Sequence, residues 1–300
     1  MPELVMSGKE VGAAIEVEVS AEVERLRGRG VEPHLAVVRV GDRPESQTYV
    51  GTKVRTAQRL GIRSEDHHLP ADTDQAGLEA VIERLNADPA VHGLLCQLPL
   101  PPHLDARRVA ERIAPGKDVD CFHPYNFGLL AEGVPRFQPC TPAGILAMLR
   151  HYRIGVAGRH VVMLGRSNIV GRPMSLLLSQ KGWDATVTVC HSRSHNLARF
   201  TQDADVLIAA IGQPEWVGPE HVRRGAVVVD VGVHRLPDAG RPRGYRICGD
   251  VRYDAVAPLA QAITPVPGGV GPLTVLMLMR NTLQAARLAA GLEMPAGLGV

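Results

Sequence analysis

The sequence predicts an α/β protein built from two α/β domains with a cleft between them, the second domain containing a Rossmann-like parallel sheet. Apolar runs of strand length alternate with helical patterns, as in a mostly parallel sheet. A glycine turn joins a strand to a helix within residues 161–182. The 300 residues are enough for two domains, and the Pro-rich segment 136–144 separates two series of elements.

The first series contains predicted strands and helices in alternation. Its strands are expected at 34–40 and 91–98, and its helices at about 8–28, 44–60, 75–86 and 105–113. Helix 44–60 has clear signals at both ends. Asp42 and Glu45 have the spacing of a capping box, Pro44 suits the first turn, and Gly61 ends the helix.

The second series begins after residue 144 and is richer in apolar strands. Strands are expected at 160–165, 185–192, 205–212 and 225–232, followed by a last helix at about 272–291. Segment 238–246 is polar and is predicted to be a surface loop. The Pro- and Gly-rich segment 263–272 is a second crossing point, after which the last helix returns to the first domain. We therefore expect one domain at 1–140 plus 272–300 and the other at 141–271.

Composition and charge exclude several classes of partner. The net charge is +2 and there is no run of five like charges, so nucleic acid and membranes are not expected as partners. The start of the chain has no secretory signal pattern, and no uncharged apolar run is long enough to cross a bilayer. Five widely spaced cysteines without a CxxC pair indicate reduced thiols in a cytoplasmic protein. No metal is expected, since the twelve histidines show no metal-binding spacing and the pair at 67–68 is interpreted as loop surface.

The strand–glycine–helix segment 161–182 indicates a phosphate site, because the start of a helix offers free N–H groups and a positive dipole end. Gly165 and Gly171 depart from the usual G-x-G-x-x-G spacing, so a simple turn remains the alternative. The following strand ends in Ser192 and Arg193, with no carboxylate for a ribose hydroxyl. With Arg166 in the turn, these groups favour the 2′-phosphate of NADP over NAD, unless both arginines are only solvated.

Four side chains of the first domain form a candidate catalytic group. Tyr49 and Lys53 are four residues apart on helix 44–60 and therefore share one face, near the carboxyl end of the preceding strand. Gln97 closes an apolar strand and either orients the lysine or bonds to loop backbone. Asp118 and Asp120 lie in one loop, where two carboxylates make a poor metal site and a single ligand-binding aspartate is the more economical interpretation.

Seven segments resemble one known family, the bifunctional methylenetetrahydrofolate dehydrogenase/methenyltetrahydrofolate cyclohydrolases. They lie in the family's order between about 40 and 282: VGDRPESQTYVGTK, VHGLLCQLPLP, KDVDCFHPYN, CTPAGI, GRSNIVGRP, VVVDVGV and ITPVPGGVGPLT. The resemblance implies an enzyme of one-carbon metabolism. It would oxidise 5,10-methylenetetrahydrofolate with NADP and hydrolyse the methenyl product to 10-formyltetrahydrofolate. It also implies a homodimer formed through the cofactor domain.

The resemblance assigns a role to each candidate side chain. Lys53 would move protons in the hydrolysis, Gln97 would hold Lys53 by a hydrogen bond, Tyr49 would stack on the folate, and Asp120 would accept N–H bonds from its pterin ring. The loop at Pro267, Gly268 and Gly269 would lie on the folate side. The implied cofactor residues are Gly165, Arg166, Ser167, Ser192, Gly232 and Thr274, with Arg166 and Ser192 on the 2′-phosphate.

One departure from the family pattern lies beside Asp120. Cys121 stands where the family usually has glycine, and a positive φ there would cost about 1 kcal/mol. Three alternatives to the bifunctional enzyme remain. They are a dehydrogenase with weak hydrolase activity, a non-catalytic NADP- or folate-binding regulator, and another NADP oxidoreductase with a two-domain cleft.

Overall fold

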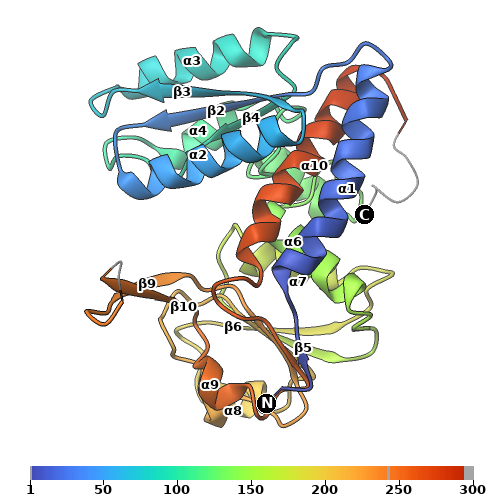
Figure 1. The fold of residues 1–300 in the computed structure, drawn as a ribbon, viewed down its shortest axis with the longest axis vertical. Coiled ribbons are helices and arrows are strands. Elements are labelled where there is room, and N and C mark those ends of the chain that lie inside the picture. The colour runs from blue at the N-terminus through green and yellow to red at the C-terminus, as the bar shows by residue number, and fades with distance from the viewer. Residues whose placement is uncertain (1, 242–243, 294–300) are drawn as a thin grey trace. The chain divides into compact units, whose positions relative to one another are not determined.

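The computed structural model describes residues 2–241 and 244–293, which form two compact units (Figure 1). One unit comprises Met1–Ala13 and Thr141–Thr274 and is called the glycine-turn unit below. The other comprises Ala14–Cys140 and Val275–Val300 and is called the Lys53 unit. The helices α1 (Gly8–Arg27) and α10 (Gly271–Ala289) contribute residues to both units.

The Lys53 unit is built on a three-stranded parallel sheet in the order β3-β2-β4. The central strand β2 (His34–Val40) is buried along most of its length, and β4 (Gly93–Cys96) is buried throughout. In Figure 1, α2 (Pro44–Arg59) and α3 (Gln75–Ala87) lie on opposite sides of this sheet. The unit also contains α4 (Ala106–Arg112) and α5 (Pro124–Ala131).

The expected start of α2 is half right. Pro44 occupies the first turn as predicted, because its fixed φ suits a helix start. The N-cap residue is Arg43, with extended backbone and no side-chain cap, so the predicted capping box of Asp42 and Glu45 is wrong. The Asp42 carboxylate lies instead 3.2 Å from the ring of His68.

The strand β3 (Arg63–Leu69) was not expected, and its histidines are not loop surface as predicted. His67 pairs in register with Val38, and its side chain is only 19% exposed. The segment lacks apolar alternation because β3 is an edge strand of its sheet, bonded to β2 alone. Pairing with an apolar central strand therefore overrides the polar composition.

The glycine-turn unit contains a six-stranded sheet in the order β1-β11-β8-β7-β5-β6, all of whose pairs are parallel. The four strands expected in the second series are present and shorter than predicted: β5 (His160–Leu164), β6 (Thr186–Cys190), β7 (Val206–Ala209) and β8 (Val227–Asp230). The two-residue strands β1 (Leu4–Val5) and β11 (Ala262–Ile263) complete the sheet. Since β1 pairs with β11, the start of the chain groups with this unit and not with the domain expected at 1–140.

Shorter elements surround this sheet. They are α6 (Cys140–His151), which sequence patterns did not reveal, α7 (Gly171–Ser179), α8 (Leu197–Thr201), the short 3₁₀ helix Pro219–His221 and α9 (Tyr253–Val256). The predicted loop 238–246 is the tip of an antiparallel hairpin of β9 (His234–Pro237) and β10 (Tyr245–Cys248), with 242–243 outside the described residues. No helix in the described part of the chain is both long and apolar enough to cross a membrane.

Candidate active site

Lys53 and Gln97 meet at the carboxyl edge of the small sheet. The helix that carries Lys53 follows β2, and Gln97 directly follows β4, which is parallel to β2. The Lys53 amine donates a 3.0 Å hydrogen bond to Gln97 Oε1. Gln97 Nε2 donates in turn to the Leu98 carbonyl at 2.6 Å. Both interpretations of Gln97 are therefore correct, because its amide group binds the lysine and the loop backbone at the same time.

Tyr49 lies one helical turn before Lys53. Its side chain is 53% exposed, whereas Lys53 and Gln97 are half-buried. Residues four apart on a helix face the same way, so the ring borders the surface from which the amine is reached. An exposed aromatic ring beside a half-buried amine offers a flat apolar surface for a ligand ring.

Cys96, the last residue of β4, is a buried thiol near the amine. Burial raises the pKa of Cys96 to about 12, and the positive charge of Lys53 opposes this rise. The thiol is therefore protonated at neutral pH and is not a nucleophile, since only the thiolate attacks. Among the side chains at this edge of the sheet, the Lys53 amine remains the candidate for proton transfer.

The two aspartates of loop 116–123 have different environments. Asp118 is 2% exposed and accepts hydrogen bonds from Phe122 N at 3.0 Å, His123 N at 2.9 Å and Asn126 Nδ2 at 2.8 Å. Burial raises the pKa of Asp118, and these bonds oppose the rise because they stabilise the charged form. Asp118 thus folds the loop, whereas the half-buried Asp120 is the one open to a ligand. Within the described residues, no cluster of three or more His, Cys, Asp or Glu is arranged to hold a metal ion.

Cys121 has the backbone conformation that glycine favours. Its φ is +61°, and its side chain is 1% exposed with the thiol donating to the Phe137 carbonyl at 3.3 Å. The strain anticipated from the sequence is therefore present, at a cost of about 1 kcal/mol. The buried thiol contact offsets part of it, and the loop keeps its left-handed turn.

The glycine turn of the other unit brings backbone segments unusually close. Gly165 has a φ of +117°, and a Cβ there would lie 2.2 Å from the Ala210 carbonyl oxygen. A Cβ on Gly171, the first residue of α7, would lie 2.2 Å from the Gly165 carbonyl oxygen. Ser167 Oγ accepts from the N–H of Val170 at 3.2 Å. The glycines thus let the turn pack tightly between β5 and the start of α7, which is the position where a helix N-terminus can meet a phosphate.

The remaining predicted cofactor residues also lie in the glycine-turn unit. Arg166 and Ser192 are exposed at the carboxyl ends of β5 and β6. Gly232 is packed so closely that a Cβ would meet the Asp250 backbone nitrogen at 2.4 Å. The hydroxyl of Thr274 lies 3.1 Å from that of Thr141.

The loop of Pro267, Gly268 and Gly269 belongs to the glycine-turn unit. The Gly8 N–H donates to the Gly268 carbonyl at 2.8 Å, so the loop is tied to the start of α1. A Cβ on Gly269 would lie 2.5 Å from the Pro265 carbonyl oxygen. The glycine at 269 therefore allows a tight backbone loop that a side chain would disrupt.

Sequence reasoning missed two buried aspartates that hold loops of the glycine-turn unit. Asp230, at the end of β8, accepts from three backbone N–H groups at 2.9 Å each. Asp250 is fully buried and accepts from Ile211 N at 2.7 Å, Gly212 N at 3.1 Å and His234 Nε2 at 2.7 Å. Burial raises the pKa of Asp230 to about 6. The available signal was an aspartate ending an apolar strand, in VVVDVGV, and another in the short GDV segment.

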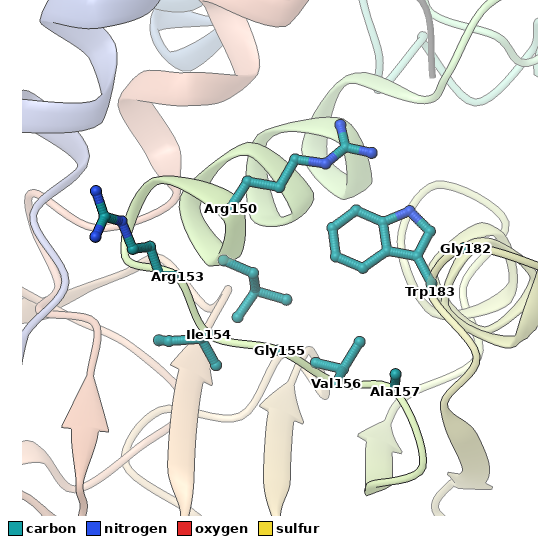
Figure 2. Close-up of a pocket in the computed structure, with 9 residues that line it drawn as sticks. Arg150, Arg153, Ile154, Gly155, Val156, Ala157, Gly182 and Trp183 are labelled. Carbon is teal, nitrogen blue, oxygen red and sulfur yellow. The ribbon is translucent and has the colours of Figure 1, made fainter.

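A separate pocket of about 330 Å³ lies at the opposite end of the same sheet (Figure 2). It is formed by the end of α6 and by the segments that lead into β5 and β6, with the Arg150 guanidinium 4.6 Å from the Trp183 ring centre. None of the predicted site residues lines it. Since open α/β sheets bind ligands at the carboxyl ends of their strands, this pocket is not the candidate site.

Two models of one protein family match most of the chain. The model described as "Tetrahydrofolate dehydrogenase/cyclohydrolase, NAD(P)-binding domain" matches residues 139–290, and the catalytic-domain model of the same name matches residues 6–120. The chain belongs to the tetrahydrofolate dehydrogenase/cyclohydrolase family. The resemblance noted in the sequence and the predicted fold class are thereby confirmed.

Named relatives share this family over nearly the whole chain. The "Bifunctional protein FolD" of Treponema pallidum (strain Nichols) is 52% identical over 292 residues, covering 97% of this chain and 93% of the relative. The structure of the bifunctional FolD of Campylobacter jejuni has a TM-score of 0.90 at 42% identity and covers 95% of this chain and 98% of its own. That of Trypanosoma brucei FolD, complexed with NADP cofactor and inhibitor, has a TM-score of 0.90 at 41% identity, with coverage of 97% and 99%.

The candidate residues divide between the two family domains. Tyr49, Lys53, Gln97 and Asp120 fall in the range of the catalytic-domain model. The glycine turn and segment 267–269 fall in the range of the NAD(P)-binding model. The family therefore places a dinucleotide domain where the sequence predicted one.

The close contact at Gly171 gives a prediction for the nucleotide domain. We expect Gly171→Ala to lower the free energy of unfolding by about 2 kcal/mol, because the new Cβ collides with the Gly165 backbone. Gly155→Ala is the matched control in the same unit, since nothing lies within 4 Å of a Cβ there, and its effect should stay within about 0.5 kcal/mol. Denaturant unfolding measures both, and equal stabilities for the two variants would contradict this account of the turn.

Proposed function

We propose that the chain oxidises 5,10-methylenetetrahydrofolate to 5,10-methenyltetrahydrofolate with NADP and then hydrolyses the product to 10-formyltetrahydrofolate. Family membership supports both reactions, and relatives named bifunctional FolD match 93% or more of their length. The observation that carries the second reaction is the hydrogen bond from the Lys53 amine to Gln97. It fixes a titratable group at the carboxyl edge of the catalytic domain's sheet.

NADP, when bound, accepts the hydride at C4 of its nicotinamide ring. The residues fit such a cofactor, because the turn that joins β5 to α7 packs so closely that a Cβ on Gly165 or Gly171 would collide with neighbouring backbone, as in a strand–glycine–helix phosphate site. In this proposal Gly165, Ser167, Gly232 and Thr274 line the cofactor site, while Arg166 and Ser192 bind the 2′-phosphate. A guanidinium fork and a hydroxyl donate to phosphate oxygens, and no carboxylate follows β6 to repel them.

The oxidation does not require the protein to transfer a proton. The nitrogen lone pairs that flank the methylene carbon drive the hydride away, so alignment of the two reactants is the main requirement. Tyr49 would supply that alignment by stacking on the folate, since its ring is exposed beside the amine. Asp120 would accept N–H bonds from the pterin ring, and the loop Pro267–Gly269 would contribute backbone contacts.

The hydrolysis needs proton transfer at two atoms. Water attacks the methenyl carbon and loses a proton as the new C–O bond forms. One C–N bond then breaks while the new hydroxyl gives up its proton to become the formyl carbonyl, and the released nitrogen takes up a proton, so that one proton is released overall. The Lys53 amine is the group placed to accept the first proton and to return one to the nitrogen. Because one of its N–H groups is held by Gln97 at 3.0 Å, the amine has a fixed orientation.

The two reactions should separate in a Lys53→Met variant. Methionine keeps an unbranched chain of similar length without the amine. We expect hydrolysis to fall about a hundredfold or more and NADP-dependent oxidation to stay within about fivefold. The rates are followed by the absorbance of methenyltetrahydrofolate and of NADPH. Arg55→Met, an exposed position on the same helix, is the control and should leave both rates unchanged. Equal loss of both activities in Lys53→Met would remove the role given to the amine.

Cofactor preference tests the assignment of Arg166. Arg166→Ala should weaken NADP binding by about tenfold or more and leave NAD binding almost unchanged, because only NADP carries the 2′-phosphate. Arg159→Ala is the control, since Arg159 is equally exposed but precedes β5 at the opposite end of the strand. Dissociation constants for both nucleotides give the answer. If the ratio of the dissociation constants for NADP and NAD is the same in Arg166→Ala as in the wild type, Arg166 does not bind the 2′-phosphate.

We also propose a homodimer formed through the cofactor domain. The strand β6 supports this, because it is an edge strand whose outer side is unpaired in the described sheet and whose Val189 is 40% exposed. Light scattering should give twice the chain mass of 32.3 kDa. A Val189→Lys variant should shift the mass toward the monomer, and a wild-type monomer at micromolar concentration would count against the dimer.

The cytoplasmic location expected from the sequence also remains a proposal. Five free, buried cysteines support a reducing compartment. Recovery of the protein from any compartment other than the cytoplasm in cell fractionation would contradict it.

A further inference from the structure

Asn281 is a buried polar side chain of α10 that the reactions above do not use. It is 6% exposed. Its Nδ2 donates to the Val119 carbonyl at 2.7 Å and to the Gln138 carbonyl at 2.8 Å. Both hydrogens of the amide are thereby used on backbone oxygens of two different chain segments. One side chain thus ties loop 116–123 and the segment before α6 to the same helix.

The tied loop segment is the one that carries Asp120. The Val119 carbonyl belongs to the peptide group that leads directly into Asp120, so its position sets the direction of that side chain. Asn281 Nδ2 also lies 3.7 Å from Cys140 Sγ. The same sulfur is 3.5 Å from the Val119 carbonyl oxygen and 3.6 Å from Asp120 Oδ1.

Cys140 extends the connection to the carboxylate itself. Its burial, together with the nearby charge of Asp120, raises the pKa of Cys140 well above its usual range. The thiol is therefore protonated and can donate its S–H to an oxygen. Asn281 and Cys140 together contact both the backbone before Asp120 and the carboxylate.

We propose that Asn281 is a positioning residue for the folate substrate, acting through Asp120. This inference rests on the proposed function, in which Asp120 accepts N–H bonds from the pterin ring. Such bonds weaken steeply when donor and acceptor are misaligned. Without the amide, two carbonyls of a buried region lose their donors, and the loop has to move to find others. The consequence is weaker folate binding with an unaltered cofactor site.

A purely structural role predicts a different result, and a neighbouring residue serves as the control. Thr282 is fully buried on the same helix, and its hydroxyl donates to the Leu278 carbonyl at 2.8 Å within α10. Thr282→Val removes a buried hydrogen bond that lies within α10 and leaves the hydrogen bonds to the Asp120 loop in place. It should lower the melting temperature and leave the KM for the folate substrate unchanged.

The test variant is Asn281→Asp, which keeps the side-chain shape and replaces the donating amide by a carboxylate that faces two carbonyl oxygens. We expect the KM for methylenetetrahydrofolate to rise about tenfold, kcat to change less, and the KM for NADP to remain as in the wild type. Asn281→Ser, which keeps one donor, should give a smaller increase and covers the case in which Asn281→Asp does not fold. An unchanged folate KM in the folded variants would overturn the proposal.

A double-mutant cycle shows whether the effect passes through Asp120. In an Asp120→Asn background the Asn281→Asp change should alter the folate KM by less than about twofold, because the positioned carboxylate is already gone. Persistence of the full increase would show that Asn281 acts elsewhere and would also overturn the proposal. A wild-type enzyme without turnover would remove the proposed function and this inference with it. Normal wild-type turnover with no effect at Asn281 would remove the inference alone.

Discussion

The parallel pairing of β2 with β4 is the constraint on which the catalytic domain depends. Parallel strands end at the same edge of a sheet, so the helix after one strand and the residue after the next are brought together whatever their separation in sequence. Lys53 and Gln97 are 44 residues apart, and their side chains nevertheless meet at 3.0 Å. A one-residue slip of β4 would turn the side chains along it to the other face and carry Gln97, which directly follows it, away from Lys53. The contact between Lys53 and Gln97 therefore depends on the register of the sheet.

Both units hold their functional loops with buried polar side chains that bond to backbone. Asp118 and Asn281 do so beside Asp120, and Asp230 and Asp250 do so beside the nucleotide segments. Burying such groups costs free energy, and each hydrogen bond returns only about 1 kcal/mol net. The main effect of these bonds is on geometry. A carboxylate that accepts three N–H groups at 2.9 Å, as Asp230 does, restricts the conformation of the loops that carry those groups. Removing one of these side chains would leave the backbone groups that it binds without a partner, so we expect substitution there to be destabilising.

How much the sequence could predict depends on how local each signal is. The glycine turn, the strands of the second series and helix α2 were predictable because apolar periodicity and glycine spacing are local. The strand β3 was not, because its polar composition becomes a strand only by pairing with β2. The grouping of Leu4 and Val5 with the glycine-turn unit could not be predicted either, because it depends on strand pairing with Ala262 and Ile263, far along the chain.

The candidate site shows the same division. The residues proposed to face a ligand were named from their chemistry and from the family resemblance, and the hydrogen bond expected between Lys53 and Gln97 is present. Asn281 could not be named, because an asparagine inside an apolar helical pattern reads as an ordinary polar position. Only the fold shows that its amide meets the carbonyls of Val119 and Gln138, which precede it by more than 140 residues.

Cys121 shows what these anchors accomplish. A residue with a Cβ at a φ of +61° costs about 1 kcal/mol relative to glycine, and an unsupported loop would relax out of that conformation. Here Asp118 binds the N–H groups of Phe122 and His123, which follow Cys121, while Asn281 binds the carbonyl of Val119, two residues before it. With the backbone fixed on both sides, residue 121 has no freedom to leave the left-handed region. The loop geometry is thus set by its buried partners and not by the residue at its tightest point, so glycine is favourable there but not required.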